Sequence, residues 1–371
     1  MSEYQYYEWQ TIDRPLTAAE QRAVDGLSSH MDTVTSTQAV VTYSWGNFKH
    51  DPAEVLLQYF DAFLYDSNFG DRRLMFRLPK SLVDVEAIRV YCIDSWITLD
   101  DHGPYFILEI TWNDENNDYE WIESGGILGQ LACLREQILQ GDYRALYIVW
   151  LKAMDSDRYA DEDDEAGPPV PAGLQNLNAG LQALIEFFEI NPHLVAAAAK
   201  SSKKAESAPE PDLESAIPKL TRAEADDHLR QIVRGEPGAV LLLKKRLAAL
   251  SGRGATTASP ATRTVAEMRQ QAEEIEQEAK RKAAEEAERQ RIQRLEKLAQ
   301  REGSAWAKVE SLLDQKRGGA YDEATALLVE LKEMAEYKKQ APQFQKFFEF
   351  IRAKYGKSVA LMERFRRAKL L

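Results

Sequence analysis

Histidines, cysteines and paired carboxylates most often carry out catalysis or bind metals, and this chain offers few useful combinations of them. None of its five histidines lies in an H-E-x-x-H motif or within a short metal-ligand spacing of another: His30, His50, His102, His193 and His228. The only cysteines, Cys92 and Cys133, are too few for a disulfide framework or a cysteine-rich zinc site. His102 follows Asp100 and Asp101, and Cys92 can approach it across a predicted sheet. We interpret this segment as an ordinary hairpin turn.

Acidic residues alternate from Asp155 to Asp163, as they do at the odd positions of a calcium-binding loop. Such a loop needs glycine at its sixth position and glutamate at its twelfth, where this chain has Ala160 and Ala166. Both substitutions remove features that calcium binding requires. The sequence therefore predicts a solvated acidic loop.

The sequence contains no P-loop, dinucleotide-binding or nucleophile-elbow motif. Gly125, Gly126 and Gly129 precede or begin a predicted helix and offer backbone N–H groups to an anion. No lysine accompanies them, however, and Glu123 would repel phosphate. No pair of carboxylates stands out as an acid and base. We therefore expect no catalytic, cofactor-binding or metal-binding residue.

Two short basic runs are the remaining candidates for a binding site. The first is 244–246, and the second, near the end of the chain, contains Arg364, Arg366, Arg367 and Lys369. Cations at the end of a helix favour its dipole, which is the simplest explanation of the second run. Its functional alternatives are nucleic-acid binding and contact with an acidic protein surface. These four residues are our candidate partner-binding residues.

The net charge of −13 is unevenly distributed along the 371 residues. Residues 1–200 contain 13 basic and 33 acidic side chains, whereas residues 303–371 contain 14 and 9. A strongly acidic segment repels phosphate backbones, so the first half is a poor nucleic-acid binder. Each end should attract partners of opposite charge.

Length and composition indicate a globular protein of two or three domains. No run of 18 or more apolar residues is present, so we expect no membrane span. The first residues lack the basic and apolar regions of a signal peptide, which predicts a cytoplasmic location.

The elements that must position any site are clearest between Asp51 and Pro79. Asp51 and Pro52 predict a helix start, and an apolar stripe continues it to Leu64. A turn at 68–70 and a strand at 73–79 follow. Further strands are predicted at 4–12, 40–45, 96–99 and 105–112, and further helices at 17–27, 128–139, 143–154, 174–188 and 192–200. The fold class is therefore α+β, with a mainly antiparallel sheet and helices on one face.

Composition divides the chain into six segments. They are an acidic α+β domain (1–200), a linker (201–218), a helical hairpin (219–252), a second linker (253–263), a long charged helix (264–302) and a helical bundle (303–371). The long helix is either solvated and held by pairs such as Glu278–Lys282 or part of a coiled coil with itself or a partner. Its alanine-rich seam favours the solvated helix.

Four helices are predicted in the bundle from their apolar stripes. The first contains Trp306, and Gly318 and Gly319 are expected to form the turn after it. The third begins at Pro342 and places Phe344, Phe347, Phe348 and Ile351 in the core.

Four segments together resemble an uncharacterised bacterial family: Tyr4–Leu16, Tyr43–Lys49, Tyr59–Tyr65 and Arg73–Pro79. The resemblance covers about residues 1–250, and it implies no activity, cofactor or catalytic residue. The segment from Trp306 onward is similar to helical tails of bacterial proteins with a SWIM-type zinc finger. The C-x-C and C-x-H pairs of that zinc site are absent from this chain.

These observations favour a non-catalytic interaction protein, in which the long helix tethers an acidic module to a basic helical module. One alternative is an enzyme with carboxylates in a cleft lined by Trp45, Trp96 or Trp112. The other is nucleic-acid binding by the basic C-terminal run.

Overall fold

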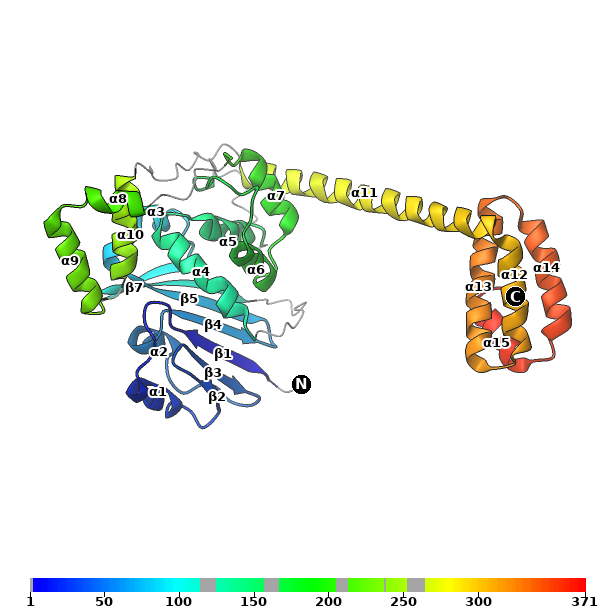
Figure 1. Cartoon of the computed structure of the whole chain (residues 1–371), viewed down its shortest axis with the longest axis horizontal. Helices are drawn as coiled ribbons and strands as arrows, with labels where there is room; N and C mark the ends of the chain where they lie inside the picture. The colour runs from blue at the N-terminus through cyan, green and yellow to red at the C-terminus, as the bar shows by residue number, and fades with distance from the viewer. Residues whose placement is uncertain (1–2, 114–124, 157–166, 205–212, 237, 252–263) are drawn as a thin grey trace. The chain divides into compact units, whose positions relative to one another are not determined.

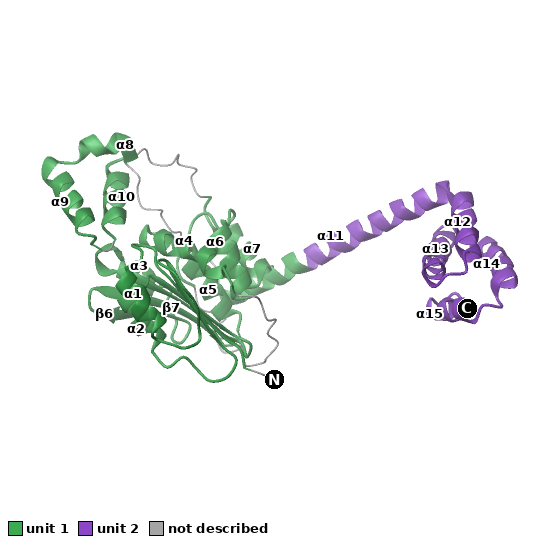
Figure 2. Cartoon of the chain, turned by 60° about the horizontal axis from the view of Figure 1, so that its bottom comes forward, with its two compact units in different colours: residues 1–276 green, residues 277–371 purple. Residues whose placement is uncertain are grey.

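The computed structural model describes residues 3–113, 125–156, 167–204, 213–236, 238–251 and 264–371 (Figure 1). The chain divides into two compact units, Met1–Glu276 and Gln277–Leu371, which we call unit 1 and unit 2 (Figure 2). Most of the calcium-loop candidate at 155–166 lies outside the described residues.

Unit 1 is organised around a seven-stranded antiparallel sheet with the strand order β2-β3-β1-β4-β5-β7-β6. The strands are β1 (Gln5–Gln10), β2 (Met31–Val34), β3 (Gln38–Tyr43), β4 (Ala62–Ser67), β5 (Asp71–Pro79), β6 (Ile97–His102) and β7 (Tyr105–Asn113). The predicted α+β fold with an antiparallel sheet is confirmed. Strand β2 was missed because its four residues are polar or half-exposed and show no clear alternation.

Successive side chains on the central strands pack into two different cores, because strand residues alternate between faces. One core joins Trp9 and Phe63 to helices α1 (Ala18–Asp25) and α2 (Pro52–Tyr59). The larger core lies on the opposite face and joins Leu64 and Phe76 to four helices: α4 (Ile127–Leu139), α5 (Arg144–Met154), α6 (Ala179–Phe187) and α7 (Pro192–Ser201). Helices therefore cover both faces, and the prediction of one covered face was wrong.

Helix α2 ends at Tyr59, earlier than the predicted end at Leu64. Its start is as predicted: the Asp51 carboxylate accepts a hydrogen bond from the N–H of Ala53. Phe60 is extended, and the next residues form β4 between β1 and β5. Pairing on both sides buries every residue of β4, and this burial outweighs the helical spacing of the apolar residues.

A buried ion network joins the sheet to α4. Asp61 precedes β4 and accepts hydrogen bonds from the N–H groups of Ile12 (2.6 Å) and Asp13 (2.9 Å) and from Nη2 of Arg77 (2.7 Å). Arg135 of α4 donates two hydrogen bonds to Asp13 (3.0 and 2.9 Å) and one to the carbonyl of Arg77 (2.8 Å). Each charge in the network therefore has a partner, as a buried charge requires.

Smaller helices complete unit 1. They are η1 (Lys80–Leu82), α3 (Val85–Arg89), α8 (Leu213–Ala216), η3 (Ile217–Lys219), α9 (Arg222–Val233) and α10 (Ala239–Leu250). Thr221 and Glu224 form a capping box at the start of α9. Helix α10 packs beside η1, and Lys245 of α10 donates hydrogen bonds to the carbonyls of Leu82 and Leu139.

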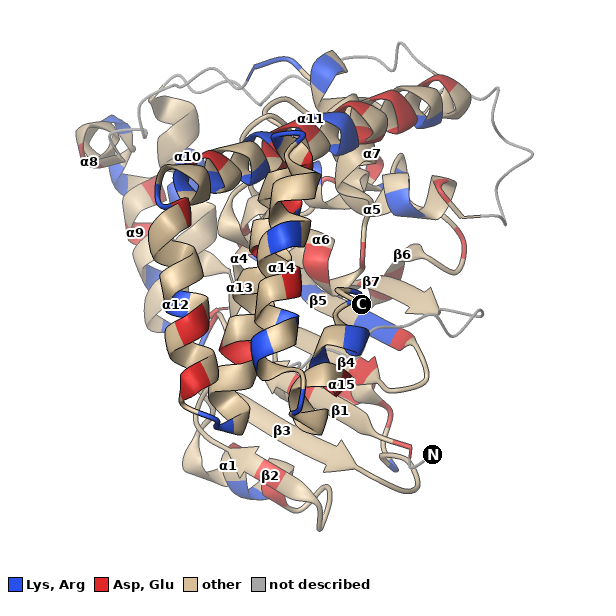
Figure 3. Cartoon of the chain, turned by 90° about the vertical axis from the view of Figure 1, so that its right-hand side faces the viewer, with Lys and Arg blue, Asp and Glu red and all other residues tan. Residues whose placement is uncertain are grey.

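Helix α11 (Val265–Gln300) confirms the predicted long helix and contributes to both units. Val265 and Met268 lie in the larger core of unit 1, and Leu295 and Leu298 lie in the core of unit 2. Side chains 277–291 are exposed, and basic and acidic residues are interspersed along the helix (Figure 3). Local pairs such as Glu278–Lys282 (2.7 Å) stabilise this stretch.

Unit 2 contains α12 (Glu302–Asp314), α13 (Gly318–Tyr337), α14 (Ala341–Tyr355) and α15 (Val359–Arg367). Helices α12, α14 and α15 each pack against α13. Gly318 and Gly319 form the first turn of α13, whereas the chain reverses at Lys316, which has a φ of 52°. The turn therefore lies at Lys316, just before the two glycines that were predicted to form it. None of the described helices is both long and apolar enough to span a bilayer.

Candidate partner-binding surface

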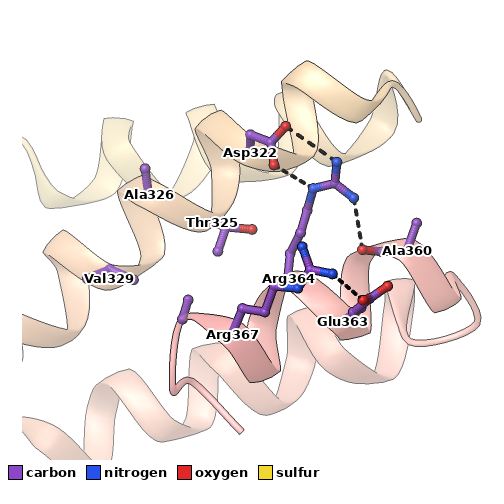
Figure 4. Close-up of a pocket in the computed structure, with 9 residues that line it drawn as sticks. Asp322, Thr325, Ala326, Val329, Ala360, Glu363, Arg364 and Arg367 are labelled. Atoms are coloured by element: carbon purple, nitrogen blue, oxygen red, sulfur yellow. Dashed lines mark hydrogen bonds and ion pairs between the residues drawn. The ribbon is translucent and has the colours of Figure 1, made fainter. Parts of the chain in front are cut away.

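The basic residues predicted to bind a partner lie on or just after α15, and acidic neighbours neutralise two of them. Arg364 donates to Asp322 of α13 (2.5 Å) and to the carbonyl of Ala360, and Arg367 forms an ion pair with Glu363. Figure 4 shows the side chain of Arg364 reaching that of Asp322, and both residues line a hollow of about 410 Å³. We call it the ion-paired hollow. The hydrogen bond from Arg364 lowers the pKa of Asp322, so the carboxylate remains charged. The guanidinium group of Arg364 is therefore already paired with an acid of its own chain.

The other two candidates do not complete a cationic site. The carbonyl of Lys369 accepts a hydrogen bond from Lys332, but its ammonium group lines neither described hollow. Arg366 likewise lines neither hollow and forms no ion pair with a described residue. The four residues predicted from the basic run are therefore not brought together around one anion-sized space.

A second hollow in unit 2 has a different character. Its volume is about 450 Å³, and it is lined by Glu310 of α12 and by Gln343, Lys346, Phe347 and Phe350 of α14. We call it the aromatic hollow. Only Phe347 among these residues was singled out in the sequence, where it was expected in the core.

Two faces of α14 explain why this hollow forms. Phe344, Phe348 and Ile351 follow a spacing of four and three residues and are buried against the rest of the bundle. Phe347 and Phe350 lie to one side of that stripe, and they are 50% and 53% exposed. The prediction that Phe347 belongs to the core was therefore wrong, because the inner face was already filled.

Trp306 of α12 supports one of the two exposed rings, that of Phe347, from beneath. Its indole stacks on Phe347, with ring centroids 5.0 Å apart and planes 24° apart. The indole is buried, and its Nε1–H has no hydrogen-bond partner among the described residues. A rigid aromatic floor costs little conformational entropy when a partner binds.

The two charged residues that line the aromatic hollow, Glu310 and Lys346, differ in whether they have an ion-pair partner. Glu310 already accepts a hydrogen bond from Lys354 (3.0 Å), whose pKa is raised by its hydrogen bonds with Tyr355 and Glu310. Lys346 forms no ion pair with a described residue. The rim therefore presents one uncompensated positive charge beside two exposed rings.

The structure gives little support to a catalytic or metal-binding site around His102 and Cys92 of unit 1. His102 is exposed at the end of β6, Asp101 pairs with Lys80 (2.5 Å), and Cys92 donates to the carbonyl of Ile88 (3.7 Å). Burial raises the pKa of Cys92 to about 11, so its thiol is protonated near neutral pH. Within the described residues, no group of three or more His, Cys, Asp or Glu side chains is placed to hold a metal.

The tryptophans proposed to line a catalytic cleft do not line either hollow. Trp96 and Trp112 pack on each other with centroids 4.5 Å apart, and Trp45 is exposed. Gly126 caps α4 in a left-handed conformation, and Gly129 lies close to the side chain of Gln10. The glycine segment thus starts a helix that packs on β1.

One buried carboxylate has a perturbed pKa of the kind found in enzyme sites. Burial raises the pKa of Glu8, although hydrogen bonds from Gln38 (2.6 Å) and Tyr6 (2.9 Å) oppose the change. Its side chain is enclosed, and neither hollow contains it. We interpret Glu8 as part of the framework between β1 and β3.

The fold and these surfaces define an α+β unit followed by a helical unit that carries an exposed aromatic hollow. No family model, curated protein or solved structure matches this chain.

Proposed function

We propose that this protein is a non-catalytic adaptor that binds another protein through the aromatic hollow of unit 2. The observation that carries the proposal is the pair of half-exposed phenylalanines on α14, beside a core that is already complete. Large apolar side chains held rigidly at a surface are typical of protein-binding sites.

The unlike charges of the two units support an adaptor with two kinds of partner. Unit 1 contains 25 basic and 45 acidic residues, whereas unit 2 contains 22 and 15. Unit 1 also exposes more than half of Leu229, Val233 and Val240 on α9 and α10, which offers a separate apolar contact surface. In this proposal α11 is the tether that carries both units.

Nucleic acid is the less favourable partner for unit 2. Asp322 and Glu363 already engage two of the basic residues in the C-terminal run, and Glu310 lines the aromatic hollow. Phosphate binding needs several free cations together. We propose a cytoplasmic location, because both cysteines are unpaired, as is usual for proteins in a reducing compartment.

Quantitative affinity purification with the full chain as bait tests the proposal. The test variant is Phe347→Ser/Phe350→Ser, and the matched control is Val359→Ser, which removes an exposed apolar side chain of α15 outside the hollow. A true partner should be recovered equally by wild type and control, and about tenfold less by the double variant. Circular dichroism checks that all three proteins fold. Identical recoveries with all three baits would contradict the proposal.

A further inference from the structure

We infer that the aromatic hollow binds an amphipathic helix of its partner, which presents two large apolar side chains one turn apart and an acidic residue beside them. This inference rests on the proposed function and names the chemical class of the partner. Three properties of the hollow carry it: its helical walls, its length and its charge.

The walls of the hollow exclude recognition by strand addition. Glu310 belongs to α12 and the other four lining residues belong to α14, so every wall is a helix face. The backbone N–H and C=O groups inside a helix are already bonded to each other, and a strand would find none to pair with. Contact must therefore be made through side chains, as when a helix lies in a groove.

The lining residues of α14 extend from Gln343 to Phe350, about two helical turns or ~10 Å. Phe347 and Phe350 occupy neighbouring turns. A helix lying along this surface would meet them with residues three or four apart, which lie on one face of a helix. Proline-rich ligands also dock against aromatic rings, so the peptide selection described below must distinguish them from a helix.

The charge of the rim selects an acidic partner over a second copy of this chain. Glu310 is occupied by Lys354, whereas Lys346 has no ion-pair partner among the described residues. In a symmetric dimer through this face, the same patch of both copies would meet, so two Lys346 ammonium groups and no additional carboxylate would enter the interface. A carboxylate on the partner helix would instead neutralise Lys346.

Selection from a phage-displayed library of random peptides, about 16 residues or roughly four helical turns long, tests the inference. Wild-type full chain is the target, and Phe347→Ser/Phe350→Ser is used for depletion. We expect enriched peptides with two large apolar residues three or four apart, net negative charge, and helical circular dichroism in the complex. Enrichment of basic or proline-rich peptides, or of none, would overturn the inference.

A charge exchange on Lys346 provides a second readout that does not depend on the phenylalanines. Fluorescence anisotropy with an enriched peptide should show about fivefold weaker binding to Lys346→Glu, and a peptide with lysine in place of its acidic residue should recover it. The control Lys357→Glu changes another exposed cation of unit 2 that lines neither hollow and should leave the affinity unchanged. Equal weakening by both variants would mean that only net charge matters, and this would refute the inference.

Two further results separate failure of this inference from failure of the proposed function. Concentration-dependent light scattering that is lost in the phenylalanine variant would identify a second copy as the occupant. Competition of the peptide by a single-stranded oligonucleotide would indicate nucleic acid instead. If affinity purification still recovers a partner that depends on Phe347 and Phe350, but no acidic helical peptide is selected, the adaptor function stands and the helical partner does not.

Discussion

Replacing Asp61 with asparagine is the sharpest test of what holds unit 1 together. The change keeps the size of the side chain but removes the charge between Arg77 and Arg135, whose nearest contacts to Asp61 are 2.7 and 3.7 Å. The side-chain oxygen of asparagine can still accept a hydrogen bond from Arg77. Its NH₂ group would then face the N–H groups of Ile12 and Asp13, so that donors would meet donors.

The expected loss is ~3–5 kcal/mol, the usual cost of removing one partner from a buried ion pair. Arg135 keeps both hydrogen bonds to Asp13, whereas Arg77 loses its only carboxylate among the described contacts. Because the whole stability of a domain is ~5–15 kcal/mol, the variant should unfold at a much lower urea concentration.

The effect of Asp61→Asn should also depend on pH. Burial by itself would raise the pKa of Asp61, but Arg135, Arg77 and the two backbone N–H groups more than offset it and hold the pKa below its usual value. The carboxylate therefore stabilises the fold above the unfolded pKa of about 3.9, and this contribution is lost as the pH falls through the lower folded pKa. The difference between wild type and variant should narrow below about pH 4.

Urea unfolding followed by tryptophan fluorescence at several pH values measures both effects. Asp101→Asn is the matched control, because Asp101 pairs with Lys80 in solvent and its loss should leave the midpoint nearly unchanged. A loss below about 1 kcal/mol for Asp61→Asn, or a difference that is constant from pH 7 to pH 3, would refute the reasoning.

Two other predictions concern single residues of unit 1. Glu8→Gln should stabilise the protein relative to wild type at pH 7, and less so at pH 4. Burial raises the pKa of Glu8, so the stability of wild type that depends on the protonated carboxyl group is lost as the pH rises through the pKa of the folded state. Urea midpoints that favour wild type more at pH 7 than at pH 4 would contradict this prediction. Cys133 should react with a thiol reagent at pH 8 faster than Cys92. Desolvation raises the pKa of both thiols, but Cys133 is exposed, whereas Cys92 is half-buried and its pKa is raised to about 11. A single reaction rate for both thiols would contradict this prediction.

The sequence predicted those elements whose ends and faces are determined by nearby residues. The capping residue Asp51 correctly locates the start of α2, because a cap acts within one turn, and Thr17 and Thr221 cap α1 and α9 in the same way. The segment from Phe60 to Leu64 was misread because a helical spacing and a fully buried strand produce the same apolar run. Only pairing with β1 and β5, which are distant in sequence, resolves that ambiguity.

The candidate site was harder to predict than the fold, for a physical reason. The basic run containing Arg364 and Arg367 is visible in the sequence, but its neutralisation by Asp322 is a contact between α13 and α15. Phe347 looks like a core residue until the bundle is seen to be filled by others, and Phe350 was not singled out in the sequence. A surplus of phenylalanines on one short helix was the only local signal of the hollow.

The size of the aromatic hollow determines the kind of interaction it can support. A phenylalanine has about 200 Å² of surface, so covering the exposed halves of Phe347 and Phe350 removes roughly 200 Å² from water. At ~25 cal/mol per Å² this gives ~5 kcal/mol, whereas association costs ~4 kcal/mol or more. The two rings alone therefore support only weak binding. A partner needs the charge of Lys346 and contacts beyond the hollow to bind with micromolar affinity, so the hollow suits a reversible contact that neighbouring surfaces reinforce.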